Sequence, residues 1–314
     1  MSTPHSRPAP RPSLLVVVPS HNGGELTLAC LDRTLPQLRA RDRLVVVDNG
    51  SWDGTTAAIG YRFGDAVPVI ARQRALGFAG ACNLGAADAA ADLIVFLNQD
   101  LLLSPDALDR LRESARIHPN AILGALLFEP EQTTIQHAGG VVLPNALTQH
   151  PHRGIQAHEL PARGFVTSDY VAGALFVVPT PVFDRLDGFD VRFAPAYFEE
   201  TDFCIRARAI GIPSLVALSV TARHFEAVTT GKDSPRYHFS YHRNRLRFVM
   251  KHYTLDALRT RFLPSERAWL RSSLSSAARQ GVGRAYAALV PELPRWVLER
   301  RRRPPLFVPQ EVAP

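Results

Sequence analysis

The segment LIVFLNQD, from Leu93 to Asp100, is an apolar run that passes directly into polar residues ending in a carboxylate. Five consecutive apolar residues predict a strand that is buried on both faces of a sheet. Ligands of open α/β sheets bind at the carboxyl ends of strands, so this strand would present Asp100 to a metal ion or a phosphate. Taken alone, the pattern more often marks an aspartate that caps a turn or helix, here before Ser104 and Pro105. Only the neighbouring segments can separate the two interpretations.

Segments of the same kind precede LIVFLNQD along the chain. Apolar strands are predicted over residues 14–18, 44–47 and 67–70. Helical patterns lie between them, and a glycine-rich segment beginning at Gly77 opens an Ala-rich helix. Strands that alternate with helices predict a parallel sheet with right-handed crossovers.

The pattern changes after residue 120. Further strands are predicted over residues 122–128, 141–143, 171–178 and 215–220. The polar, irregular segment 149–163 is typical of a loop that covers a substrate or stays mobile. Its histidines, His150, His152 and His158, lack the spacing of a metal-binding helix and are expected in an exposed loop. Gly173 indicates a close approach of backbone or ligand within its strand.

The composition indicates a globular protein with a full hydrophobic core. The chain has 314 residues, of which 46% are hydrophobic, enough for one large domain with an appendage or for two modest ones. No apolar run approaches the roughly 18 residues that span a bilayer, and the first residues lack the apolar centre of a secretory signal. We therefore expect a cytoplasmic protein. The cysteines, Cys30, Cys82 and Cys204, are widely spaced and are expected to be buried free thiols.

The net charge of +7 favours an anionic partner but does not identify one. Residues 1–12, rich in Pro and Arg, are expected to form a disordered tail. Residues 251–314 form a basic helical extension that contains the run Arg300 to Arg303. This run is either a solvated tail or a contact with the inner face of an anionic membrane. No motif for reading nucleic acid accompanies the charge.

The segment YFEETDFCIRARAIGI, from Tyr197 to Ile212, predicts a helix with acidic residues in its first turn. The helix dipole favours such residues, and Asp202 can pair with Arg206 one turn later. Neither Glu199 nor Glu200 is needed for that pair. One of the two glutamates is therefore available for chemistry.

Taken together, these segments resemble the family 2 inverting glycosyltransferases with the GT-A fold, in particular the rhamnosyltransferase-like branch. The matching motifs, in order, are VVVPSHN, VVVDNGSWDGT, GFAGACNLGA, VFLNQD, VAGALFVV followed by GFD, and FEETDFCIRARAIG. The resemblance covers roughly residues 13–250. It implies a Rossmann-like, mostly parallel nucleotide-binding sheet (residues 13–127), a mixed acceptor and catalytic half (residues 128–250) and the helical extension.

The resemblance also implies roles for individual residues. Asp100 and His224 would hold a divalent metal, Mg²⁺ or Mn²⁺, on the donor diphosphate. Glu200 would be the base that deprotonates the acceptor, with Glu199 as the alternative. Further residues are expected to bind the nucleotide sugar: Pro19, Asn22, Asp48, Asn83 and Asn98. The acceptor is expected to contact Gly173, Ala174, Arg243 and Arg245, with the two arginines meeting its phosphates.

The resulting expectation is a metal-dependent enzyme that transfers a hexosyl or deoxyhexosyl group, with inversion, from a nucleotide diphosphate sugar. The acceptor would be a hydroxyl group of a cell-surface polysaccharide or of its lipid carrier. Asn98 stands where many relatives carry aspartate, which favours rhamnose or a similar deoxysugar as the donor. The alternative is a catalytically silent module that binds nucleotide sugars. A nicotinamide dehydrogenase is disfavoured because the first loop, PSHNGGEL, lacks GxGxxG.

Overall fold

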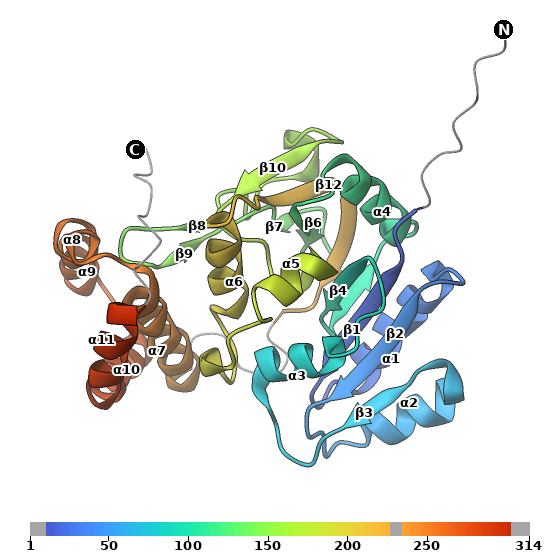
Figure 1. Cartoon of the computed structure of the whole chain (residues 1–314), viewed down its shortest axis with the longest axis horizontal. Helices are drawn as coiled ribbons and strands as arrows, with labels where there is room; N and C mark the ends of the chain where they lie inside the picture. Colours follow the sequence, from blue (N-terminus) through green and yellow to red (C-terminus); the bar gives the residue numbers. More distant parts are fainter. Residues whose placement is uncertain (1–10, 227–233, 303–314) are drawn as a thin grey trace, which may run out of the picture.

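The computed structural model describes residues 11–226 and 234–302, and a large mixed sheet lies at its centre (Figure 1). The strand order is β10-β12-β6-β11-β4-β1-β2-β3, with β5 paired to β12 and β7 paired to β6. Alternate residues of β1 enter different hydrophobic clusters: Leu15 and Val17 face one, and Leu14, Val16 and Val18 face the other. The sheet is therefore covered on both faces, which explains the continuous apolar runs of its central strands.

The first half of the chain forms the parallel part of the sheet. Its strands are β1 (Leu14–Ser20), β2 (Arg43–Asp48), β3 (Val69–Ala71) and β4 (Leu93–Leu97). They are connected by helices α1 (Gly24–Thr34), α2 (Thr55–Phe63) and α3 (Gly77–Ala86). β1 pairs in parallel with β2 on one side and with β4 on the other. The strand order thus reverses between β1 and β4, and such a switch point opens a crevice at the carboxyl ends of the strands.

The second half adds strands of both directions. β11 (Leu175–Pro179) lies antiparallel between β4 and β6 (Ile122–Phe128), and β12 (Ser214–His224) runs parallel to β6. The shorter strands are β5 (Leu101–Leu103), β7 (Ile135–His137), β8 (Val141–Val142), β9 (Thr148–Gln149) and β10 (Phe165–Ser168). The helices of this half are α4 (Ala107–Ile117), α5 (Thr180–Arg185) and α6 (Glu199–Arg208). The predicted parallel sheet with a mixed second half is confirmed.

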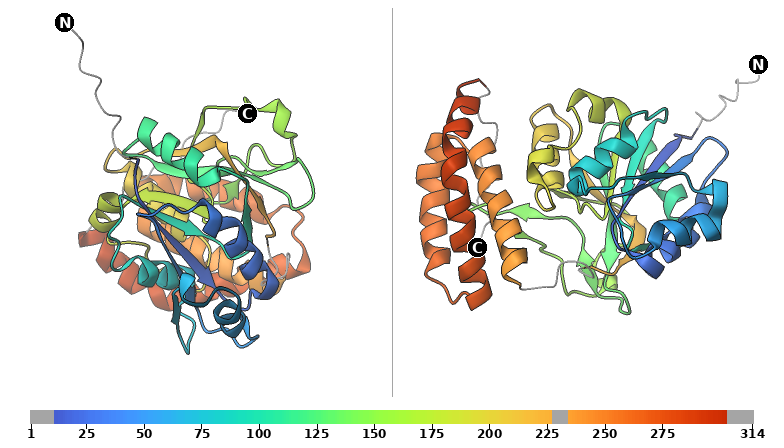
Figure 2. Two further views of the ribbon diagram at one scale, coloured as in Figure 1. Left: turned by 90° about the vertical axis from the view of Figure 1, so that its right-hand side faces the viewer. Right: turned by 90° about the horizontal axis from the view of Figure 1, so that it is seen from below.

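Helices form the C-terminal part, on the side of the molecule away from β1–β3 (Figure 2). They are α7 (Pro235–His252), α8 (Leu255–Ala257), α9 (Leu263–Leu270), α10 (Ser276–Leu289) and α11 (Leu293–Arg302). Short 3₁₀ segments are η1 (Leu35–Gln37), η2 (Gly64–Ala66), η3 (Ala157–Glu159), η4 (Val191–Phe193) and η6 (Val290–Glu292), and Leu258–Phe262 forms a π-helical turn, η5. No helix within the described residues is long and apolar enough to cross a membrane. Residues 1–10 of the tail predicted over residues 1–12, and the end of the basic extension from residue 303, lie outside the described residues.

One predicted strand begins several residues later in the structure. The strand expected over 171–178 begins only at Leu175, because Ala172, Gly173 and Ala174 form a loop in the wall of a cavity. Helix α7 begins at Pro235, where Ser234 caps it by accepting a hydrogen bond from the Tyr237 backbone N–H at 3.1 Å. The cysteines are buried and free, as predicted.

Candidate active site

A cavity of about 700 Å³ opens at the carboxyl end of β4. Its walls come from the turn after β4, the loop before β11, the start of α6, the end of β12 and the first turns of α7. More than half of the residues predicted for the site line it: Asn98, Asp100, Gly173, Ala174, Glu199, Glu200 and His224. Pro19, Asn22, Asp48, Asn83, Arg243 and Arg245 do not belong to its lining. A cavity of this size can hold a ligand as large as a drug molecule.

The pairing of β5 with β12 brings Asp100 and His224 together. His224, the last residue of β12, lies opposite Leu101 in the antiparallel register, and the Phe225 backbone N–H donates to the Asp100 carbonyl at 3.0 Å. His224 Nε2 lies 3.4 Å from Asp100 Oδ1. Asp100 Oδ1 is buried and has no hydrogen-bond partner among the residues that the structure describes. Buried polar atoms of this kind are rare and call for an explanation.

The surroundings of His224 determine which of its ring nitrogens carries the proton. Gln136 Nε2 donates to the His224 carbonyl at 3.0 Å and to Glu129 Oε2 at 3.3 Å. The other atom of this side-chain amide, Oε1, is therefore the oxygen, which accepts hydrogen bonds. His224 Nδ1 lies 2.7 Å from that oxygen and therefore donates to it. When the ring is neutral, its lone pair is on Nε2, which faces Asp100 Oδ1. Two acceptors that face each other are stabilised by a cation between them or beside them.

These residues fit a divalent cation that is shared with a ligand. A histidine that ligates a metal usually donates its other N–H to a carbonyl or carboxylate oxygen, as His224 does here. No cluster of three or more metal-binding side chains occurs within residues 11–226 and 234–302, so protein atoms would fill only part of the coordination shell. Mg²⁺ is commonly held in this way, by one or two protein ligands and the phosphates of a substrate.

Glu199 and Glu200, at the start of α6, lie in different surroundings. Glu199 is 3% exposed, and its Oε2 has no hydrogen-bond partner in the described part of the chain. Burial, together with the charge of Glu200, raises the pKa of Glu199 well above its usual range. Glu200 is half-buried, and burial raises its pKa to about 7. Glu199 therefore favours its neutral form, whereas Glu200 changes charge near pH 7, as a general base should.

The backbone directly before Glu199 is strained. Tyr197 and Phe198 have φ values of 81° and 76°, in the left-handed region that large side chains rarely adopt. Each such residue costs on the order of 1–3 kcal/mol and persists only where its surroundings enforce it. Strain of this kind is concentrated at functional sites.

Side chains of α7 hold this strained turn. Asn244 has no exposed surface, and its Nδ2 donates to the carbonyl oxygens of Phe193, Ala196 (2.9 Å) and Tyr197 (3.0 Å). Arg243 donates to the Ala194 carbonyl, and Arg247 donates to the Arg192 carbonyl at 2.6 Å. Sequence analysis missed Asn244; its only signal was an amide within the apolar pattern of a helix.

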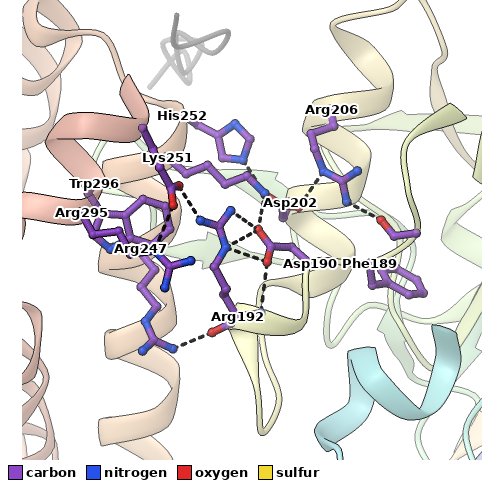
Figure 3. Close-up of polar contacts among 12 residues, drawn as sticks. Phe189, Asp190, Arg192, Asp202, Arg206, Arg247, Lys251, His252, Arg295 and Trp296 are labelled. Carbon is purple, nitrogen blue, oxygen red and sulfur yellow. Dashed lines mark hydrogen bonds and ion pairs between the residues drawn. The ribbon is translucent and has the colours of Figure 1, made fainter. Parts of the chain in front are cut away.

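The contacts of Asp202 indicate a structural role and not a catalytic one. It is fully buried and forms ion pairs with Lys251 (2.6 Å) and Arg206 (2.8 Å), and His252 Nε2 lies 2.7 Å from its Oδ1 (Figure 3). Burial by itself would raise the pKa of Asp202, but Lys251 and Arg206 outweigh it and hold that pKa well below its usual range. The predicted pair with Arg206 is confirmed. The cluster joins α6 to the C-terminal helices.

Three residues predicted for the nucleotide lie at the carboxyl ends of the neighbouring strands β1 and β2 or in the loop after β1, outside the cavity lining. Asn22 Oδ1 accepts from the Trp52 backbone N–H at 2.9 Å, which ties the loop after β1 to the loop after β2. Asp48 accepts from the Ser51 N–H at 3.0 Å and from Thr56 Oγ1 at 2.8 Å, and Pro19 precedes Asn22 at the end of β1. Their contact with a nucleotide stays a prediction.

Gln99 and Trp52 are features of this region that sequence analysis missed. Gln99 Oε1 accepts from the His21 backbone N–H and from Ser20 Oγ, both at 2.8 Å, so it fastens the end of β1 to the turn after β4. Trp52 is 78% exposed beside His21, with ring centroids 5.1 Å apart. An exposed tryptophan next to a predicted nucleotide loop is an available stacking surface.

Three predictions about binding residues do not agree with their positions. Asn83 is engaged with the backbone of Phe189, to whose carbonyl it donates at 2.8 Å and from whose N–H it accepts at 2.9 Å. Arg245 has no exposed surface and makes two contacts of 2.6 Å with Glu266, so it cannot meet a phosphate. Arg243 lies outside the cavity lining and donates to the Ala194 carbonyl. Sequence patterns predicted helical positions for these residues but not the direction of their side chains.

A comparison with protein families matches residues 15–171 to the family described as Glycosyl transferase family 2. Among curated proteins, the chain is 25% identical over 234 residues to the O-antigen biosynthesis protein RfbC of Myxococcus xanthus. It is 24% identical over 239 residues to the uncharacterized protein y4gI of Sinorhizobium fredii. Each alignment covers 71% of this chain but only 18% and 26% of those proteins, so the chain spans about a quarter of their length or less.

Solved structures share the fold at low sequence identity. GalNAc-T7 with UDP, GalNAc and Mn²⁺ has a TM-score of 0.66 at 15% identity, and the match covers 92% of this chain and 54% of that chain. Mannosyltransferase PcManGT from Pyrobaculum calidifontis, in complex with GDP-Man and Mn²⁺, has a TM-score of 0.56 at 16% identity, with 95% and 83% covered. TarS 1–349 of S. aureus has a TM-score of 0.54 at 14% identity, with 92% and 85% covered.

Proposed function

Because this chain belongs to glycosyl transferase family 2, we propose that it transfers a sugar, with inversion, from a nucleotide diphosphate sugar to an acceptor hydroxyl group. One observation carries the proposal. The same cavity contains two facing acceptors, Asp100 Oδ1 and His224 Nε2, and a carboxyl group, Glu200, whose pKa burial raises to about 7. A cation-binding pair beside a base is the arrangement that displacement of a diphosphate from a sugar requires.

In the proposed reaction, Glu200 accepts the proton of the acceptor hydroxyl. The oxygen forms a bond to the anomeric carbon while the bond from that carbon to the diphosphate oxygen breaks, and the nucleoside diphosphate leaves with the electron pair. A divalent cation held by Asp100 and His224 would neutralise the charge that develops on the leaving diphosphate. Asn98, beside Asp100, supplies an amide to the same wall of the cavity.

We further propose rhamnose or a similar deoxysugar as the donor sugar. The support is Asn98 in place of an aspartate and the distant similarity to an O-antigen biosynthesis protein. The proposed acceptor belongs to a cell-surface polysaccharide or is linked to its lipid carrier. The basic C-terminal extension is proposed to make a peripheral contact with an anionic membrane.

Thermal stabilisation by a panel of nucleotide diphosphate sugars, with Mn²⁺ or Mg²⁺ present, tests the proposal. We expect one nucleotide class to stabilise the native protein only when metal is present. Asp100→Asn and His224→Gln should abolish the metal-dependent part, because the first removes the carboxylate charge and the second removes the imidazole nitrogen that faces it. The matched control Asp65→Asn changes a carboxylate near β3, outside this cavity, and should behave as the native protein. Stabilisation that is equal with and without metal in all four proteins would refute the proposed metal site.

A nucleotide sugar that binds but is never consumed, with every acceptor offered, would instead favour the silent binding module. Hydrolysis of the donor to the nucleoside diphosphate separates these cases, because it reports on the chemistry without an acceptor. Native protein that releases nucleoside diphosphate in a metal-dependent manner supports a transferase.

A further inference from the structure

Part of the cavity wall consists of residues that have no role in the reaction described above. The segment around β9 contributes Thr148 and His150, and the first turns of α7 contribute Tyr237 and Tyr241. Tyr170, ahead of β11, also belongs to the lining. Burial raises the pKa of Tyr170 and of Tyr241, and the charge of Glu200 contributes to both shifts, so this wall lies within electrostatic reach of the proposed base.

The proton position on His137 follows from its hydrogen bonds. The Ala172 backbone N–H donates to His137 Nε2 at 3.1 Å, so that nitrogen carries the lone pair of the neutral ring. Burial lowers the pKa of His137 well below its usual range, which keeps the ring neutral. Its proton is therefore on Nδ1, which lies 2.7 Å from His150 Nδ1 and must donate to it.

This bond determines the tautomer of His150 in turn. Nδ1 of His150 accepts the hydrogen bond, and burial lowers the pKa of this ring also, so its single proton is on Nε2. The Tyr170 hydroxyl lies 3.4 Å from that nitrogen, a hydrogen bond longer than the typical 2.7–3.2 Å and therefore weak. His150 is half-buried in the cavity wall. Its Nε2–H is therefore a donor of fixed position in the cavity wall, and a ligand oxygen at a shorter distance can replace the weak bond to Tyr170.

Tyrosine rings stand beside this donor. Tyr197 meets Tyr237 edge to face at 5.4 Å between centroids, and Tyr237 stacks against Tyr241 at 6.1 Å with an interplanar angle of 18°. Tyr241 is held in place because its hydroxyl accepts from the Thr148 backbone N–H at 3.0 Å. All three rings are half-buried and line the cavity. Rings with an apolar face and a polar edge suit a ligand of the same mixed character, such as a pyranose.

The charges of this wall disfavour a phosphate. Arg153 is the one Lys or Arg among the described residues that line the cavity, and it already pairs with Glu226 at 3.0 Å and with Glu129 at 3.2 Å. Glu200 and Glu226 add negative charge to the same lining. An anionic group would therefore be repelled here, whereas an uncharged hydroxyl group would not be.

We propose that this wall binds an uncharged pyranose unit of the acceptor, with its ring against the tyrosines and one of its oxygens accepting from His150 Nε2–H. The acceptor is thus recognised through a saccharide unit and not through a lipid phosphate. The inference rests on the proposed function, because it assigns the second substrate of the same cavity. It also replaces the prediction that Arg243 and Arg245 meet acceptor phosphates.

Nuclear magnetic resonance of protein labelled with ¹⁵N in its histidines tests the tautomer first. At pH 7 we expect His150 to have a protonated Nε2 and an unprotonated Nδ1, whatever the substrate is. Methyl glycosides of rhamnose, glucose, galactose and mannose are then added separately, with farnesyl phosphate as the phosphate-bearing probe. At least one glycoside should shift the His150 ring resonances, and farnesyl phosphate should not. A protonated Nδ1 on His150, or a shift with farnesyl phosphate alone, would overturn the inference.

Variants with matched controls complete the experiment. His150→Ala and Tyr237→Ala should each weaken glycoside binding about three- to tenfold, the loss expected for one hydrogen bond or one ring contact. His158→Ala and Tyr61→Ala remove exposed side chains of the same types outside the cavity and should bind as the native protein does. Tyr237→Phe keeps the ring and should also bind normally, which distinguishes a lost contact from a misfolded wall. Equal binding by native protein, His150→Ala and Tyr237→Ala would refute the subsite.

The donor experiment keeps the two proposals distinguishable. If nucleotide sugars bind with metal and no glycoside binds, only the acceptor inference fails. If glycosides bind and no nucleotide sugar does, the transferase proposal fails and the subsite remains a saccharide-binding site.

Discussion

Two adjacent glutamates acquire different properties from their positions on one helix turn. Glu199 is buried, with 3% of the residue exposed, and its carboxyl group favours the neutral form. Glu200 faces the cavity and keeps partial contact with solvent, so its pKa rises only to about 7. A base must be ionised at the working pH yet still bind a proton readily, and Glu200 meets both conditions.

We predict that Glu200→Gln lowers kcat by about 10²–10⁴, the usual contribution of a positioned base. In the native protein, kcat should rise as the pH increases through about 7, because only the ionised carboxylate accepts a proton. The rate should level off above that pH. Initial rates measured across pH with a consumed donor check both points.

Glu199→Gln is the matched control for this experiment. It should retain the rise of kcat with pH, because burial favours the neutral form of Glu199 and an amide resembles that form. A large loss of kcat in Glu199→Gln with little loss in Glu200→Gln would assign the base to Glu199 instead.

At the scale of elements, α7 determines the geometry of the catalytic turn although it lies outside the region that matches the family. Asn244 Nδ2 donates to three carbonyl oxygens of the segment from Phe193 to Tyr197. The strained residues are Tyr197, at the end of this segment, and Phe198 after it. The segment also packs on α3: the Phe78 N–H donates to the Pro195 carbonyl at 2.8 Å. The start of α6 is thus held from both sides.

We predict that Asn244→Asp lowers kcat at least tenfold while the KM for the donor changes little. The substitution preserves shape but replaces an amide donor with an oxygen that faces three carbonyl oxygens, at a cost of about 1–3 kcal/mol in the free energy of unfolding. Because Glu200 would move, the midpoint of the rising pH limb should also shift. Urea unfolding and pH profiles check this.

The exposed Asn120 provides a control. Asn120→Asp should change neither kcat nor the pH profile. Asn244→Asp could lower the free energy of unfolding and leave both kcat and its rise with pH as in the native protein. Asn244 would then be a structural residue without a positioning role.

At the scale of the molecule, charge is distributed unevenly. Residues 251–314 contain twelve Lys and Arg residues and five Asp and Glu residues. The net charge of this region is therefore +7, which equals the net charge of the whole chain. Exposed apolar side chains gather in the same region, among them Leu255, Val290, Val297 and Leu298. Basic and apolar residues on one set of helices fit the surface of an anionic membrane.

We predict that the protein sediments with vesicles containing phosphatidylglycerol but not with neutral phosphatidylcholine vesicles, and that raising the salt concentration releases it. Val290→Ser combined with Leu298→Ser should reduce binding severalfold. Ile117→Ser, which changes an exposed apolar residue on α4, is the control and should not. Equal binding to both vesicle types, or to neither, would contradict the proposed membrane contact.

The sequence by itself determined the elements and their order. Continuous apolar runs predicted β1, β2, β4 and β6 because a strand covered on both faces must be apolar at every position. The acidic residues at the end of β4 and at the start of α6 were predicted as candidate site residues, because polar groups at those ends remain accessible to a ligand. Such local patterns depend only on residues near one another in the chain.

Only the tertiary structure decided how the side chains are directed. Whether His224 faces Asp100 depends on the register of β12 against β5, and that register is set by packing across the whole sheet. The packing of α7 likewise determines two other contacts. Arg245 is buried against Glu266, and Asn244 donates hydrogen bonds to the turn before α6. These contacts join residues distant in the chain, and a hydrogen bond tolerates only a few tenths of an ångström, so residue spacing alone contains no information about them.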